Sequence, residues 1–221
     1  MSNLLDDNIK SQVKEFFNDL KEPVSLLFFD SETENCQFCE DTKQLLDEIS
    51  KLSDLIEVKT YDIEKDASVA QKYRIDKVPA TVIAAKDEGV IQDSGIKYFG
   101  IPSGHEFSSL VNSIRIVSMR DSGLSPQTRE TLKKIKEPVQ LQVFVTPTCP
   151  YCPRAVVVAH QMAFENPFIE ANMIEAMEFP TLSDQFGVSG VPHTTINATA
   201  GEIIGAVGED QLLAEILQVL G

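Results

Sequence analysis

The sequence predicts an α/β fold made of two consecutive units of the same design. Each unit contains a Cys-X-X-Cys pair, Cys36-Gln37-Phe38-Cys39 in the first and Cys149-Pro150-Tyr151-Cys152 in the second. Val78-Pro79 follows the first pair and Val191-Pro192 follows the second, with 43 positions from first cysteine to proline in both cases. The constellation therefore recurs at an offset of 113 residues. A period of this length is too long for a solenoid repeat, so it indicates a duplicated domain.

The first unit, residues 1–118, is expected to run helix, strand, helix, strand, helix, strand, strand, helix. Its opening helix, residues 3–20, carries apolar side chains such as Leu5, Ile9 and Val13 at helical spacing, and Pro23 lies just beyond its end. The apolar run 24–29 predicts a buried strand, and a helix is expected from Cys36 to about Leu52. The later elements are expected at 55–61 (strand), 68–73 (helix), 81–85 and 95–99 (a strand hairpin) and 103–118 (helix).

The second unit, residues 119–221, repeats this order after a boundary at 119–124. Ser125-Pro126 predicts a helix start, with serine as N-cap and proline at the first helical position, and this helix is expected to end near Lys136. Strands are then expected at 139–145, 168–174, 194–197 and 202–206. Helices are expected from Cys149, around 182–186 and at 210–220.

Composition limits the classes of function. The 221 residues contain no apolar run near the ~18 residues of a membrane span, and the N-terminus shows no signal peptide. The formal net charge of −15 disfavours nonspecific binding to nucleic acid or to an anionic membrane. We therefore expect a cytoplasmic protein that binds neither nucleic acid nor membrane.

All four cysteines lie in the two pairs. In a cytoplasmic protein, close cysteines indicate a metal site or catalysis more often than structural disulfides. A zinc site is disfavoured, because the pairs are about 110 residues apart and no histidine stands at ligand spacing beside them. Disulfide exchange fits better, because a helix N-terminus stabilises a thiolate and a second thiol on the same turn can resolve the mixed disulfide.

The order of strand, Cys-X-X-Cys helix and Val-Pro strand resembles the thioredoxin fold, and Cys149-Pro150-Tyr151-Cys152 is similar to the glutaredoxin active site. Two such units in one chain resemble the protein disulfide oxidoreductases of archaea and bacteria. The resemblance implies two tandem thioredoxin-like domains, each a central mixed sheet flanked by helices. It also implies that Cys36 and Cys149 attack while Cys39 and Cys152 resolve.

The resemblance further implies that Val78-Pro79 and Val191-Pro192 are substrate-facing loops. The expected redox groups are the Cys36–Cys39 and Cys149–Cys152 disulfides, with no other cofactor. Two departures from thioredoxins are present. Ala80 and His193 follow the prolines where thioredoxins usually carry threonine, and the strand 141–145 lacks the buried acid that accepts a proton from the resolving cysteine. The first unit has only Asp30, at its strand end.

The charges around the two pairs differ. Five acids flank the first pair: Asp30, Glu32, Glu34, Glu40 and Asp41. Arg154 is the single base among residues 137–221. We predict a lower pKa for Cys149 than for Cys36, because negative charge raises the pKa of a thiol. Arg154 is either a solvated charge or a group that favours the Cys149 thiolate; His193 either tunes that thiolate or is a satisfied buried histidine.

Three functions remain open. The first is protein thiol–disulfide exchange, by reduction, oxidation or isomerisation, with a thioredoxin-reductase-like flavoprotein and a peroxiredoxin as expected partners. The second is an electron relay between a flavoprotein reductase and a peroxidase, as in the N-terminal part of alkyl hydroperoxide reductase flavoproteins. The chain has no Gly-rich dinucleotide fingerprint, so any flavin is expected on a separate protein. The third is a non-enzymatic protein with structural disulfides or zinc.

Overall fold

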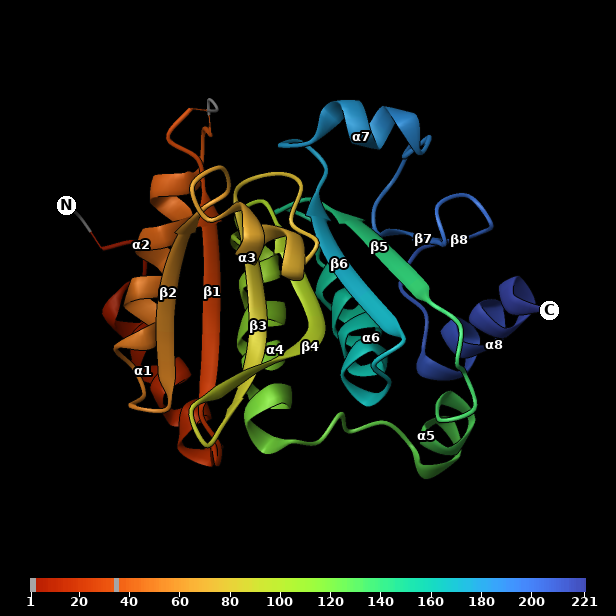
Figure 1. Ribbon diagram of the computed structural model, residues 1–221, viewed down its shortest axis with the longest axis horizontal. Coiled ribbons are helices and arrows are strands. Elements are labelled where there is room, and N and C mark those ends of the chain that lie inside the picture. The colour runs from red at the N-terminus through yellow and green to blue at the C-terminus, as the bar shows by residue number, and fades with distance from the viewer. Residues whose placement is uncertain (1–2, 34–35) are drawn as a thin grey trace.

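The computed structural model describes residues 3–33 and 36–221, and its centre is one continuous eight-stranded sheet (Figure 1). The strand order is β2-β1-β3-β4-β6-β5-β7-β8. The strands are β1 Val24–Asp30, β2 Ile56–Asp62, β3 Ala80–Asp87, β4 Val90–Phe99, β5 Val139–Val145, β6 Ile169–Glu175, β7 His193–Ile196 and β8 Gly201–Ile204.

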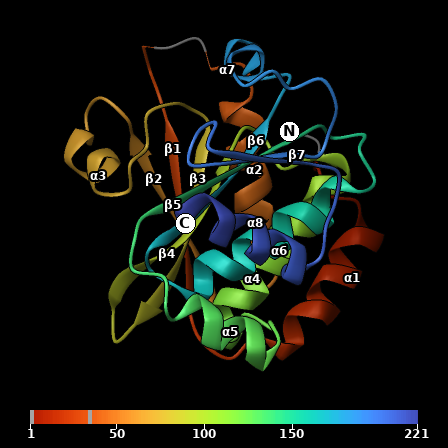
Figure 2. The same ribbon diagram turned by 90° about the vertical axis from the view of Figure 1, so that its right-hand side faces the viewer.

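Helices cover both faces of this sheet. In Figure 2, α1, α4 and α6 lie on one side of the strands and α3 lies on the other. The helices are α1 Asp7–Phe16, α2 Cys39–Ser50, α3 Ala67–Lys72, α4 Phe107–Met119, α5 Pro126–Leu132, α6 Cys152–Glu165, α7 Pro180–Gln185 and α8 Glu209–Leu220, with short 3-10 turns η1 Phe17–Asp19 and η2 Gly104–Glu106. Among the described residues, no helix combines the length and the apolar character that a membrane crossing requires.

The expected order of elements is confirmed in both halves, with differences at helix ends. The two helices expected to open at Cys36 and Cys149 are assigned from Cys39 and Cys152 instead. In the second half Cys149 precedes Pro150, and a residue before proline is disfavoured in the helical region. The helix expected to reach Lys136 ends at Leu132, where 3-10-type bonds such as Ile135 N–H to Leu132 C=O tighten the last turn.

The expected mixed sheet is present in each half. In the first half, β1 pairs parallel with β2 and antiparallel with β3, which pairs antiparallel with β4. The second half repeats this as β6, β5, β7 and β8. The division into units at residues 118 and 119 stays a prediction, and it falls at the last residue of α4, just before the stretch that links α4 to α5.

The halves meet where β4 pairs parallel with β6, from Ile96 opposite Ala171 to Phe99 opposite Ile174. We call this pairing the seam. At the seam, the fully buried Nζ of Lys97 lies 2.6 Å from Oε2 of Glu170, and Nε of Arg74 donates to the same oxygen at 2.6 Å. Helices α4 and α6 pack against each other beside it. The seam therefore fixes the position of one Cys-X-X-Cys helix relative to the other half.

Candidate active sites

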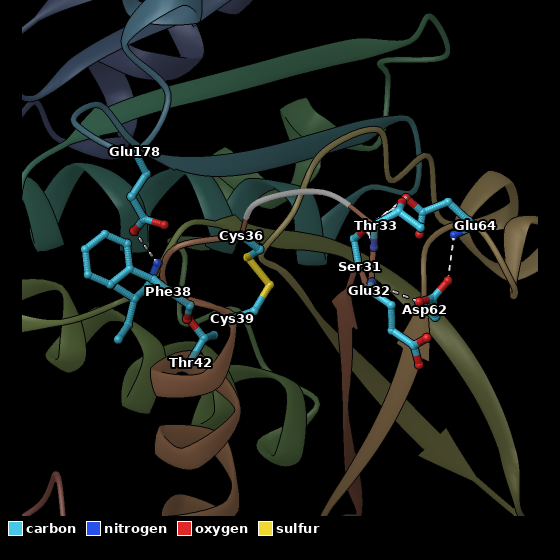
Figure 3. The surroundings of a disulfide bond; sticks show 11 residues. Ser31, Glu32, Thr33, Cys36, Phe38, Cys39, Thr42, Asp62, Glu64 and Glu178 are labelled. Atoms are coloured by element: carbon cyan, nitrogen blue, oxygen red, sulfur yellow. Dashed lines mark hydrogen bonds between the residues drawn. A yellow bond between two sulfur atoms is a disulfide. The ribbon is translucent and has the colours of Figure 1, made fainter.

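Both Cys-X-X-Cys pairs form disulfides, Cys36–Cys39 and Cys149–Cys152, each with 5.5 Å between its Cα atoms. Figure 3 shows the first of them. Each lies where a buried central strand, β1 or β5, ends and a helix, α2 or α6, begins. Burial differs within each pair. Cys36 is partly exposed while Cys39 retains 8% exposure, and Cys149 retains 8% while Cys152 has none. In both pairs the first sulfur is thus on the more accessible residue.

Each Val-Pro step lies beside the strand that leads into a disulfide. Val78-Pro79 and Val191-Pro192 are both cis. Ala80, after the first proline, is opposite Phe29 of β1, and His193, after the second, is opposite Phe144 of β5. The carbonyls of Pro79 and Pro192 accept from the N–H groups of Gly100 and Gly205 at 2.9 and 2.8 Å. The duplicated sequence pattern is therefore a duplicated geometry.

Acidic residues surround the first disulfide, as expected from the sequence. The Ser31–Thr33 segment lies beside Asp62 and Glu64, and Figure 3 places this acidic group on the opposite side of Cys36–Cys39 from Glu178. Burial raises the pKa of Asp30, and Lys43 partly offsets that rise. Lys43 is a nearby cation that the sequence analysis missed. Glu34 lies outside the described residues.

Arg154 and His193 differ in their surroundings. Arg154 is exposed on the first turn of α6, and within residues 3–33 and 36–221 its guanidinium has no hydrogen bond or ion pair. His193 is only 2% exposed, its Nε2 lies 3.5 Å from Oε2 of Glu202, and its ring meets Phe144 edge-on. The acidic side chain that lies next to the His193 ring is therefore that of Glu202. The tuning of the Cys149 thiolate by Arg154 or His193 stays a prediction.

Glu106 is a buried acid of the first half, in a turn that contacts the second half. Glu106, in η2, is 1% exposed and accepts from Ser109 Oγ at 2.6 Å, while its Oε1 has no partner among the described residues. Burial raises the pKa of Glu106 to about 7. The turn η2 contacts α6, the helix of the second disulfide. The turn that contacts this helix therefore contains a carboxyl whose pKa is about 7.

A close approach of backbones holds this turn in place. The N–H of His105 donates to the carbonyl of Pro147, two residues before Cys149, at 2.9 Å. Gly104 has φ of +59°, and a Cβ there would collide with the Pro147 carbonyl. Glycine is therefore required at 104 for both conformation and space. An acid at a helix start suggests an exposed cap, so the sequence offered only a weak signal for the burial of Glu106.

Glu106 continues into a buried hydrogen-bonded chain across the two halves. Ser109 Oγ lies 3.4 Å from Tyr98 Oη, Tyr98 Oη lies 2.8 Å from Ser113 Oγ, and Ser113 Oγ lies 2.8 Å from His160 Nδ1 on α6. Burial lowers the pKa of His160 to about 3, so its ring is neutral at physiological pH. The chain links η2, β4 and α4 of one half to the active-site helix of the other.

The described part of the chain contains no group of three or more His, Cys, Asp or Glu side chains placed to hold a metal ion. The groups available for chemistry at the two sites include the four sulfur atoms.

Comparisons with known proteins agree with this geometry. Residues 139–219 match the model of the thioredoxin domain. The crystal structure of a protein disulfide oxidoreductase from Aeropyrum pernix k1 is 30% identical, with a TM-score of 0.87, over 97% of this chain and 94% of that one. A structure of the alkylhydroperoxide reductase AhpF from Enterococcus faecalis is 26% identical, with a TM-score of 0.88, over 96% of this chain and 99% of that one.

Among curated proteins, an NADH dehydrogenase of Bacillus subtilis is 26% identical over 99% of this chain. The chain spans 38% of the length of that relative. The match to the Aeropyrum pernix structure extends over nearly the full length of both chains, and both Cys-X-X-Cys disulfides are present in the fold described above. The chain therefore belongs to the tandem thioredoxin-like family of protein disulfide oxidoreductases.

Proposed function

We propose that this protein exchanges thiols and disulfides with protein substrates at two sites. The observation that carries the proposal is the twofold occurrence of one geometry, a Cys-X-X-Cys disulfide at a helix start beside a Val-Pro step. Helix N-termini stabilise thiolates, and the more accessible first cysteine of each pair suits it for attack. In this proposal Cys36 and Cys149 attack, Cys39 and Cys152 resolve, and the Val-Pro steps face the substrate.

In the reducing direction the electrons balance in two steps. The Cys149 thiolate attacks one sulfur of a substrate disulfide, forms a mixed disulfide and releases the first substrate thiolate. The Cys152 thiolate then attacks the Cys149 sulfur, forms the Cys149–Cys152 disulfide and releases the second substrate thiolate. Two electrons pass from the enzyme dithiol to the substrate, and the reverse order oxidises a substrate dithiol. Cys36 and Cys39 act in the same way.

The resolving thiol must lose a proton before the second step. Glu106 suits this role at the second site, because it is buried, lies in a turn that contacts α6 and has a pKa of about 7. A carboxyl with that pKa takes up a proton near neutral pH far more readily than an ordinary glutamate. At the first site the proposed proton acceptor is Asp30, the last residue of β1 in the same half, and burial raises its pKa.

The first test is the equilibrium reduction potential of Cys149–Cys152 in a Cys36→Ser/Cys39→Ser variant, read by mass after alkylation in glutathione buffers. A reversible value above about −200 mV indicates an oxidase or isomerase, and one near about −270 mV indicates a reductase or relay. A pair that never exchanges would contradict the catalytic role of that site and favour the structural alternative.

The similarity to the alkylhydroperoxide reductase of Enterococcus faecalis favours a second candidate, a dedicated relay of electrons from a flavoprotein to a peroxidase. The two candidates differ in substrate range. A general oxidoreductase reduces a generic protein disulfide such as that of insulin, whereas a dedicated relay reduces its peroxiredoxin partner and leaves insulin almost untouched. Parallel assays with both substrates and one chemical reductant distinguish them.

The proposal also covers the cofactor, the partner proteins and the compartment. Because the sulfur atoms carry the electrons, the chain needs no other cofactor, and a separate thioredoxin-reductase-like flavoprotein would re-reduce it. A peroxiredoxin is the proposed electron acceptor in the relay case. We place this chemistry in the cytoplasm, where reducing systems keep thiols reduced.

A further inference from the structure

A groove of about 350 Å³ lies beside the Cys36–Cys39 turn and is lined by residues of both halves. One wall comes from the first site itself, through Gln37 and Phe38, the two residues between Cys36 and Cys39. The opposite wall comes from the second half, through Pro147 and the segment after β6 that contains Glu175 and Glu178. Figure 3 shows Glu178 and Phe38 together on one side of the Cys36–Cys39 disulfide.

The polar side of this groove is formed by two glutamates, and one of their carboxylate oxygens has no hydrogen-bond partner among the described residues. Glu175 is 3% exposed; its Oε2 accepts from the N–H of Glu178 at 2.6 Å, and its Oε1 has no partner among the described residues. Oε1 of Glu178 accepts from the N–H of Ile101 at 2.7 Å. The described side chains that line the groove include no base. Two neighbouring carboxyls are thus held by backbone donors, and no described cation lies between them.

The ionisation of these carboxyls reflects that environment. Burial raises the pKa of Glu178 to about 7, with Glu175 beside it adding to the rise, and burial also raises the pKa of Glu175. A cation placed between them would lower both pKa values and would pair the free oxygen of Glu175. The groove is therefore electrostatically suited to a positively charged group.

The remaining wall is apolar and accessible. Met177 lies between the two glutamates in sequence and is 75% exposed, and Phe38 is partly exposed on the other side. Apolar side chains of this kind cover the methylene stem of a lysine or arginine, whose charged end can reach further into a polar site. The groove thus combines an apolar entrance with an acidic interior.

We propose that this groove binds a lysine or arginine side chain of the substrate polypeptide, close in sequence to the cysteine that reacts at Cys36–Cys39. The inference rests on the proposed thiol–disulfide exchange and assigns a substrate class to its first site. The first site is the one concerned, because Gln37 and Phe38 belong to its Cys-X-X-Cys turn. The acidic character of the whole chain, with a net charge of −15, attracts the same class of partner over longer distances.

The test uses a Cys149→Ser/Cys152→Ser background, in which only the first site exchanges. Two disulfide-bonded peptides differ at a single position beside the reacting cysteine, with lysine in one and glutamine in the other. We expect kcat/KM to be about tenfold higher for the lysine peptide, in line with a charge-assisted hydrogen bond to a carboxylate. The preference should increase as pH rises through 7, because Glu178 ionises there.

Glu178→Gln and Glu175→Gln should each reduce the preference for the lysine peptide, with the double variant close to no preference. Glu137→Gln is the matched control, because it removes the same charge from an exposed position just before β5 and outside the groove. This control should retain the full preference.

A small neutral disulfide, hydroxyethyl disulfide, distinguishes failure of the basic-side-chain preference from failure of disulfide exchange at the first site. Normal exchange with it, together with equal rates for the two peptides, would overturn the basic-side-chain inference and leave the proposed function standing. Loss of exchange with all three substrates in the Cys149→Ser/Cys152→Ser background, with a folded chain by circular dichroism, would overturn exchange at the first site itself.

Discussion

Lys97 and Glu170 form a buried ion pair across the seam, with 2.6 Å between Nζ and Oε2, although they lie in different halves of the chain. Arg74 also donates to Glu170, and Asn172 donates to the other carboxylate oxygen at 3.0 Å. Glu170 therefore has three donors, whereas Lys97 depends on Glu170 for its ion pair. Because of this asymmetry, removing Glu170 and removing Lys97 should lower the stability of the protein by different amounts.

We predict that Glu170→Gln destabilises the protein more than Lys97→Met does. Removal of Glu170 leaves a fully buried ammonium without its counter-ion, and breaking a buried pair in this way costs about 3–5 kcal/mol. Lys97→Met leaves Glu170 paired with Arg74. Urea unfolding at pH 7 measures the difference, and equal losses for the two variants would contradict the asymmetry.

Glu106 should make stability depend on pH. Its pKa is about 7 in the fold against an ordinary 4.5, so the folded state holds this proton more tightly than the unfolded state does. The resulting stabilisation is complete below pH 4.5 and is lost as pH rises to 7, by roughly 3 kcal/mol over that range.

Glu106→Gln should therefore reduce the loss of stability between pH 4.5 and 7, with the contribution of Glu178 remaining, and should be more stable than the wild type at pH 8. Denaturant midpoints between pH 4 and 8 measure this, with Glu137→Gln as the exposed control. If Glu106 also accepts the Cys152 proton, the variant will resolve the mixed disulfide at Cys149 more slowly at pH 7. A parallel pH profile for wild type and variant would refute the raised pKa.

Cys149 should have a lower thiol pKa than Cys36. The first site lies among Asp30, Glu32 and Asp62, whereas the second has the exposed cation Arg154 on the first turn of its helix. Arg154→Ala should raise the pKa of Cys149 by a few tenths of a unit, since the side chain is exposed and its field is screened. Thiolate absorbance titration of single-site variants reports both values, and a lower pKa at Cys36 would reverse the assignment.

Glu48 should anchor the N-terminal segment to α2 until strongly acidic pH. Its carboxylate accepts from the N–H groups of Leu4 and Leu5 and from Gln44, and it lies 3.4 Å from Lys10 Nζ. Burial alone would raise its pKa, but these donors and Lys10 lower the pKa to about 2. The stabilisation is present above the ordinary pKa of 4.5 and is lost as pH falls toward 2.

Glu48→Gln should accordingly lower the urea midpoint at pH 7, and the gap from wild type should close near pH 2. Limited proteolysis near residues 4–10 at pH 7 provides a local readout. A gap that stays constant between pH 7 and 2 would show that the charge of Glu48 is not responsible.

Local patterns predicted most of the fold. The strand 139–145 is predicted with its observed limits because Val, Leu and Val alternate with Gln before an apolar end, and Pro138 bounds the segment. The N-cap at Ser125 is confirmed by its bond from the Thr128 N–H. These features depend on a few neighbouring residues. The spacing places two sulfurs on one turn in each pair, which also suits a metal site; the disulfide pairing was implied by the family resemblance and is confirmed here.

Features that join the halves could not be predicted in this way. Glu106 and Pro147 are far apart in sequence, and the approach of η2 to Pro147 depends on the pairing of β4 with β6. The same holds for Glu178 and Ile101, which create the groove. The duplicated sequence pattern predicts the fold of each unit, but it does not predict which edges of the two sheets pair.

The seam also has a consequence for assembly. Because β6 corresponds to β2 and β4 to β8, the halves join head to tail, an arrangement that has no closing symmetry and could in principle continue into a filament. Strand pairing shows which residues are equivalent in the two halves. Glu202 of β8 is the equivalent of Lys97 of β4, because they pair with the equivalent residues Thr195 and Val82. Glu57 of β2 is likewise the equivalent of Glu170 of β6, because they pair with Ser25 and Gln140. A further copy added at the free edges would therefore bring Glu202 toward Glu57, so repulsion replaces the attraction of Lys97 for Glu170. The short β8 offers four residues for such an addition where β4 has ten, so charge and strand length both oppose extension beyond two units.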